Sequence, residues 1–146
     1  MWSLLTTCFE EFGDWIHNAL NLYADDFHVC DIFHSAAEFR ECLRKIGRIL
    51  DIMTDAGLTI NVEKTQIVLA VKGAQQAALL RQRTKRTARI WFLCIPRREG
   101  NCSLIQLVKQ TVYLGMVINY KDHLDATVRA RIVAVGMPSV VSASGS

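Results

Sequence analysis

The sequence has only two prolines, and no apolar run approaches the length of about 18 residues that a membrane-spanning helix requires. No basic segment precedes an early apolar stretch, and Glu10 and Glu11 lie near the N-terminus, so a secretory signal peptide is not predicted. We therefore expect an intracellular protein, in the nucleus or the cytoplasm, with no membrane partner.

Cysteine pairs at short spacing are also missing. The five cysteines form no C-x-x-C motif and leave an odd number, so a disulfide framework is not predicted. His28 and His34 flank Cys30, but this single grouping lacks the paired ligands of a zinc site. We expect reduced, mostly buried thiols.

Acidic residues are absent between Glu63 and Glu99, whereas this interval holds nine of the 17 basic residues. The net charge of only +3 conceals this asymmetry. A run of one sign suits phosphate contacts, because each neutralised phosphate releases counterions from a nucleic acid. A solvated surface without a ligand would show the same pattern. The candidate phosphate contacts are Arg81, Arg83, Lys85 and Arg86.

Periodic apolar patterns, in a chain with 51% apolar and 21% charged residues, predict one compact α+β domain over residues 1–135. The predicted helices cover residues 1–12, 35–56, 73–88 and 124–135. The predicted strands cover residues 19–23, 27–30, 58–62, 66–71, 90–95, 104–108 and 111–119. We expect an antiparallel sheet with helices packed on one face, followed by a flexible tail over residues 136–146.

The longest predicted helix has signals at both ends. Ser35 suits the N-cap position, and Glu38 three residues later completes a capping box. Gly57 suits the left-handed conformation that often follows a last helical turn. Apolar residues between these ends recur at steps of three and four, so we expect this face to pack on the core rather than bind a cofactor.

Two adjacent carboxylates, Asp25 and Asp26, stand between the apolar segments 19–23 and 27–30, which alternate as the strands of a β-hairpin do. Like charges side by side repel, and turn chemistry explains one aspartate more easily than two. Mg²⁺ removes the repulsion, because it prefers carboxylate oxygens and also binds substrate phosphates. Adjacent aspartates also occur in ordinary surface turns, so their spacing alone leaves both interpretations open.

Three motifs, taken in order, resemble those of a polymerase family. Tyr23-Ala24-Asp25-Asp26 between two apolar strands resembles the Y-x-D-D box of reverse transcriptases. After one long helix, residues 56–65 (AGLTINVEKT) are similar to the G-L-x-I-N-x-x-K-T motif of non-LTR retrotransposon polymerases. Tyr113-Leu114-Gly115 resembles the primer-grip motif of the same family.

The resemblance implies a partial polymerase palm with the start of the thumb, and nucleotide addition by a two-metal mechanism that uses Mg²⁺. Asp25 and Asp26 would supply carboxylates to the metal pair, and Lys64 would stabilise or protonate the leaving pyrophosphate. The partners implied for the full-length protein are an RNA template, a DNA primer and deoxynucleoside triphosphates. The residues implied to contact the primer are Tyr23, Ala24, Tyr113, Leu114 and Gly115.

The chain also departs from the family's pattern. A third aspartate is expected from a strand well upstream of the Y-x-D-D box, but only 22 residues precede Tyr23, and Asp14 lies too close. The glutamine–glycine motif that shapes the nucleotide pocket is missing as well. We therefore expect an incomplete metal site and a chain that is inactive alone. Lys64 could instead be a solvated turn residue, and we expect Asn61 to shape that turn.

Two other functions fit the same residues. A non-catalytic nucleic-acid-binding remnant of a retroelement would use the basic stretch 72–98 and the hairpin without turnover. A plain α+β domain with an accidental pair of aspartates would bind nothing at this turn.

Overall fold

The computed structural model describes residues 2–23, 26–113, 116–119 and 131–137, with side chains described for residues 5–20 and 27–109. The helices are α1 (Trp2–Phe12), α2 (Asp14–Ala19), α3 (Ala36–Asp55), α4 (Ala74–Arg83) and the short 3-10 helix η1 (Arg98–Gly100). The strands are β1 (Leu20–Tyr23), β2 (Asp26–Ile32), β3 (Gln66–Ala70), β4 (Thr84–Thr87), β5 (Ile90–Pro96), β6 (Cys102–Val108), β7 (Gln110–Tyr113), β8 (Met116–Asn119) and β9 (Arg131–Met137). None of the helices in these ranges is long and apolar enough to cross a membrane.

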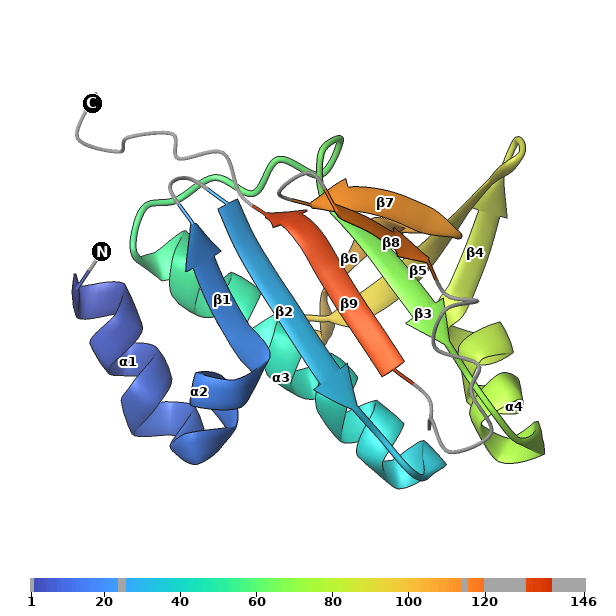
Figure 1. Ribbon diagram of the computed structural model, residues 1–146, viewed down its shortest axis with the longest axis horizontal. Coiled ribbons are helices and arrows are strands. Elements are labelled where there is room, and N and C mark those ends of the chain that lie inside the picture. The colour runs from blue at the N-terminus through green and yellow to red at the C-terminus, as the bar shows by residue number, and fades with distance from the viewer. Residues whose placement is uncertain (1, 24–25, 114–115, 120–130, 138–146) are drawn as a thin grey trace.

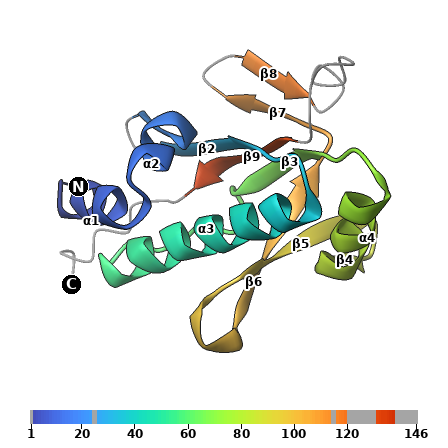
Figure 2. The ribbon, with the colours of Figure 1, turned by 90° about the horizontal axis from the view of Figure 1, so that it is seen from below.

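Seven of the strands form one sheet in the order β1-β2-β9-β3-β6-β5-β4. Neighbouring strands run antiparallel except β3 and β6, which are parallel. β7 and β8 pair separately, and Figure 2 shows their hairpin on the side of the sheet away from α3. The α+β class is confirmed, but the sheet is mixed where we predicted an antiparallel one. A parallel pair needs a long connection, and the chain between β3 and β6 supplies one by forming α4 and the β4–β5 hairpin.

Helix α3 forms where its end signals predicted it. The Ser35 hydroxyl accepts a hydrogen bond from the backbone N–H of Glu38 at 3.1 Å, and the Glu38 carboxylate accepts one from the backbone N–H of His34 at 2.6 Å. At the other end Gly57 has φ +87°, and the backbone N–H of Leu58 donates to a carbonyl near the end of the helix at 3.0 Å. These bonds satisfy backbone groups that a helix terminus leaves unpaired.

The core lies between α3 and the sheet, and Figure 1 shows α3 crossing behind the central strands. Phe27 and Val29 of β2 alternate into it and are 1% and 0% exposed. Gly47 allows α3 to approach β5 closely, because a Cβ at this position would lie 1.8 Å from the carbonyl oxygen of Pro96. The apolar residues that α3 buries are Phe39, Cys42, Leu43, Ile46, Ile49, Leu50, Ile52 and Met53.

Two predicted elements take a different form. Residues 58–62 show only an isolated bridge at Thr59 instead of a strand, and from Val62 the chain enters a turn closed by hydrogen bonds to Asn61. The helix predicted over residues 73–88 ends at Arg83, and Thr84–Thr87 continue as the edge strand β4. Pairing with β5 decides the conformation of this segment, since strand formation depends more on cross-strand neighbours than on local preference.

The C-terminal part of the described chain forms strands rather than a helix. The single strand predicted over residues 111–119 is the hairpin β7–β8, and residues 131–137 form β9 where we predicted the end of a helix over 124–135. β9 lies between β2 and β3 and is paired on both sides, which suits its β-branched residues. It continues to Met137, past the predicted domain end at residue 135.

None of the five cysteines, all of which lie in the described residues, forms a disulfide. Cys8 and Cys42 are buried and Cys102 is exposed, whereas Cys30 and Cys94 are intermediate. Only two of the five are buried, so the prediction of mostly buried thiols is wrong.

Candidate active site at the hairpin end of the sheet

The predicted β-hairpin is present. β1 pairs antiparallel with the first four residues of β2, and the last pair sets Tyr23 opposite Asp26, which begins the strand instead of standing in the turn as predicted. Figure 1 shows this end of the two strands at the upper edge of the sheet. Ala24 and Asp25 lie outside the described residues, as do the side chains of Tyr23 and Asp26. Metal binding by Asp25 and Asp26 therefore stays a prediction, on a hairpin that is confirmed.

The turn that carries Lys64 lies at the same end of the sheet, where β2 and β3 begin. His28 pairs with Val135 of β9, and Val135 pairs with Gln66 of β3, so His28 and Gln66 are level. Both β2 and β3 run antiparallel to β9 and therefore run in the same direction. Lys64 stands two residues before Gln66, and Asp26 stands two residues before His28. β2 and β3 are two strand spacings, or roughly 10 Å, apart, and the Lys64 turn precedes β3 at the end of the sheet where β2 begins.

Asn61 builds the turn that presents Lys64. Its carbonyl accepts hydrogen bonds from the backbone N–H groups of Lys64 (3.1 Å) and Thr65 (2.9 Å), and from the Thr65 hydroxyl (2.7 Å). Its side-chain oxygen accepts another from the backbone N–H of Lys64 at 3.2 Å. The prediction that Asn61 shapes this turn is confirmed. The Lys64 residue is exposed, and its role near a leaving group stays a prediction.

The strands beside the hairpin add no carboxylate at this edge. β9 lies next to β2, and its residues, Arg131–Met137, include no aspartate or glutamate. β3 contains none either, and Asp31 stands near the far end of β2. Glu63 lies at the same edge, but in the turn two strands away. In the part of the chain that is described, no group of three or more His, Cys, Asp or Glu side chains could hold a metal ion. The residues at this edge thus fit a two-metal site only in part.

The segment that resembles a primer grip, residues 113–115, falls in the β7–β8 hairpin. Tyr113 ends β7 opposite Met116, which begins β8. Leu114 and Gly115 lie outside the described residues. β7 lies against β3 and β9, on the face of the sheet away from α3 (Figure 2). The backbone of Tyr113 is placed by this pairing, and contact of the motif with a primer stays a prediction.

The predicted phosphate contacts gather on α4 and β4. Arg81 is exposed and Arg83 half-buried in the last turn of α4, while Lys85 and Arg86 are exposed on β4. The Arg86 guanidinium lies 5.6 Å from the centre of the Trp91 ring. Because β1 and β4 are opposite edges of the sheet, these cations form a site separate from the hairpin. Their binding of phosphate stays a prediction.

Two other basic residues of this interval form ion pairs within the protein. Arg97 donates to the buried carboxylate of Asp51 at 2.6 Å, and Arg98 forms a bidentate pair with Asp55. Hydrogen bonding with Arg98 lowers the pKa of the Asp55 carboxyl below its ordinary value. Sequence reasoning missed these pairs, although a charged residue on the buried stripe of α3 indicates that Asp51 needs a partner.

Comparisons with known proteins do not identify a family. No protein-family model, curated protein or solved structure matches this chain. What bears on function is the three sequence motifs and the end of the sheet where two of them meet.

Proposed function

We propose that this chain is a segment of an RNA-directed DNA polymerase of the non-LTR retrotransposon type, carrying a partial palm. One observation supports this above the others: the register of the sheet brings the start of β2 and the Lys64 turn to the same edge. Two motifs of one catalytic centre must meet in this way, although a long helix separates them in the sequence. An accidental pair of aspartates would not require such a meeting.

In this proposal, Asp25 and Asp26 are the carboxylates that bind Mg²⁺, whose chemistry is activation of a primer 3′-hydroxyl and stabilisation of pyrophosphate. The Lys64 ammonium stabilises or protonates the leaving pyrophosphate. Tyr23 and Ala24 lie against the primer end. The partners are an RNA template, a DNA primer and deoxynucleoside triphosphates. The residues that grip the primer are Tyr113, Leu114 and Gly115.

The proposed activity belongs to a longer protein, and the chain alone is inactive. β9, the strand beside the hairpin, carries no acidic residue, so the third carboxylate of the family is not replaced there. The motif that shapes the nucleotide pocket is missing as well. Positioning of reactants supplies up to roughly 7–11 kcal/mol in such reactions, so its loss together with a metal ligand removes the activity.

Primer extension on a primed RNA template, with Mg²⁺ or Mn²⁺, tests this proposal. The intact chain and the Asp25→Ala variant should give the same background signal. Extension by the intact chain that disappears in Asp25→Ala would contradict the inactivity of the chain alone, although it would support the role of Asp25 in a polymerase.

A second candidate is a non-catalytic nucleic-acid-binding remnant. The observation that favours it is the exposed basic edge at β4, in an interval without acidic residues. This function predicts that nucleic-acid binding survives replacement of both Asp25 and Asp26 by asparagine. The polymerase proposal predicts instead that the double variant loses the part of primer binding that depends on divalent metal.

A further inference from the structure

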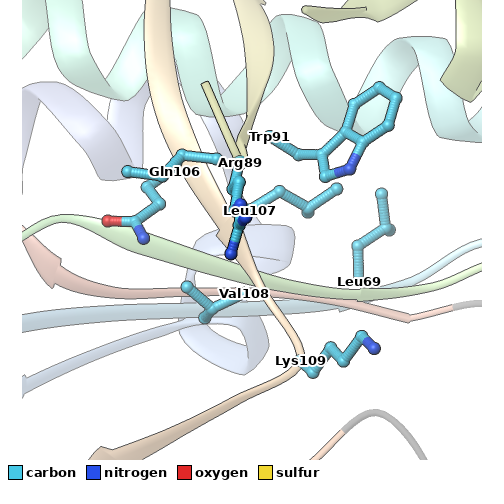
Figure 3. A pocket seen from close by; sticks show the side chains of 8 residues that line it. Leu69, Arg89, Trp91, Gln106, Leu107, Val108 and Lys109 are labelled. Atoms are coloured by element: carbon cyan, nitrogen blue, oxygen red, sulfur yellow. The ribbon is translucent and has the colours of Figure 1, made fainter. Parts of the chain in front are cut away.

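A surface groove lies beside Trp91, on strands remote from the hairpin. It has a volume of about 360 Å³, within the range of ligand pockets. Trp91 is 46% exposed, although Leu93, two residues later on the same face of β5, is 0% exposed. Figure 3 shows the side chains of Trp91, Leu107 and Leu69 turned to the same side, where they make the apolar part of the groove.

The pairing register explains how the Trp91 ring is held. Arg86, Trp91 and Leu107 form one row across β4, β5 and β6. The Arg86 guanidinium approaches the ring from β4, 5.6 Å from its centre, a distance at which cation–π attraction operates. The groove opens toward β6 and β3, which supply Leu107 and Leu69. The indole thus stands between a cation on one side and an apolar hollow on the other.

The charge around the groove has one sign. Arg89, from the turn between β4 and β5, and Lys109, after the end of β6, are both exposed and both line it. None of the lining residues is acidic. A negatively charged ligand with a flat apolar part is complementary to this surface. A ligand that has only the negative charge, or only the apolar part, would match half of it.

We propose that this groove binds one base of a single-stranded nucleic acid. The base stacks on the Trp91 indole above Leu69 and Leu107, and the neighbouring phosphates contact Arg89 and Lys109. Stacking on an aromatic side chain within a basic surface is the usual means of binding unpaired strands without sequence preference, whereas the bases of a duplex are already stacked on one another. The inference rests on the proposed function only in taking nucleic acid as the partner, and it needs no catalysis.

Fluorescence anisotropy with a short labelled oligouridylate and a labelled duplex tests the proposal. Trp91→Leu should weaken single-strand binding about tenfold, the effect of losing one stacked base, and should leave duplex binding unchanged. Trp91→Phe should retain most of the affinity, because it keeps an aromatic face. Arg89→Gln should weaken binding, while Arg40→Gln, which removes an exposed charge on α3, should not.

Several results would overturn the proposal. One is an intact chain that does not bind the oligouridylate, and another is a Trp91→Leu variant with unchanged single-strand affinity. Equal losses for single strand and duplex would also contradict it. Thermal unfolding of each variant shows whether it is folded, and Arg89→Gln supplies a second test if Trp91→Leu is not. Primer extension does not enter these measurements, so failure here leaves the polymerase proposal to be judged separately.

Discussion

Arg97 donates a hydrogen bond through Nε to the carboxylate of Asp51 at 2.6 Å, linking the turn after β5 to helix α3. The same carboxylate accepts a bond from the backbone N–H of Arg98 at 3.2 Å, and Arg97 also donates to the Ser103 hydroxyl at 2.8 Å. Asp51 is 3% exposed, so its charge depends on these donors rather than on water. The pair therefore holds the turn between β5 and β6 against α3.

Replacing Arg97 with methionine should lower the free energy of unfolding by about 3 kcal/mol, because it leaves the Asp51 carboxylate buried without its cation. Chemical denaturation measures the loss. Arg98→Met is the matched control, since the Arg98–Asp55 pair is half exposed and solvent screens it. Equal losses of unfolding free energy in the two variants would contradict a larger contribution of the buried Arg97–Asp51 pair.

Gly47→Ala should destabilise the protein, although alanine favours a helix over glycine by about 1 kcal/mol. The added Cβ would lie 1.8 Å from the carbonyl oxygen of Pro96, a backbone atom that cannot move aside without shifting β5. We expect a net loss of about 2 kcal/mol or more in the free energy of unfolding. Arg40→Ala, at an exposed position of the same helix, is the control and should change the free energy of unfolding by less than about 0.5 kcal/mol. A Gly47→Ala variant as stable as the parent would contradict this packing of α3 on β5.

Thiol modification at pH 8 should follow burial. Cys102 is exposed and should react first, whereas Cys8 and Cys42 are buried and should react only on unfolding. Burial, with a smaller effect of Glu11, raises the pKa of Cys8 to about 11, and burial also raises the pKa of Cys42. A raised pKa lowers the thiolate fraction and hence the rate. Cys102→Ser should remove the fast phase of the reaction. Rapid reaction of Cys8 or Cys42 in the folded protein would contradict their burial in the core.

Nucleic-acid binding by the α4–β4 surface should depend steeply on salt. Neutralising four cations there should flatten the slope of log affinity against log salt by up to about 3 for single strands. The residues to change to glutamine are Arg81, Arg83, Lys85 and Arg86. The control removes four charges from α3, at Arg40, Arg44, Lys45 and Arg48. The same slope in the α4–β4 variant and the parent would place binding elsewhere.

Local signals were enough to predict some elements. The α3 helix follows from Ser35 and Gly57, which cap it through bonds to near neighbours, and the β1–β2 hairpin follows from alternation across a short turn. Pairing between distant segments decides the rest. β9 forms because it pairs with β2 on one side and with β3 on the other, and β4 forms because it pairs with β5. Helix α2, over residues 14–19, was not predicted either.

The candidate sites divide in the same way. Asp25, Asp26 and Lys64 were proposed from sequence motifs, each of which is a short contiguous segment. Their position at one end of the sheet could be found only from the pairing of β2 and β3 with β9. The groove at Trp91 has no sequence signal, because Leu69 and Leu107 come from strands that meet only in the folded sheet. The same applies to the Arg97–Asp51 pair, whose members are 46 residues apart.

Binding of Mn²⁺ at the hairpin end of the sheet is the most direct test of the proposed polymerase segment, because Mn²⁺ replaces Mg²⁺ at carboxylate sites and broadens nearby amide resonances. In ¹⁵N–¹H spectra of the intact chain, Phe27 and the Lys64 turn should broaden first. Ile32, about 20 Å along β2, should keep its intensity. Replacing Asp25 and Asp26 together by asparagine should abolish this pattern, and Asp31→Asn should preserve it. Broadening that survives the double replacement, or that centres on Asp31, would contradict the proposal.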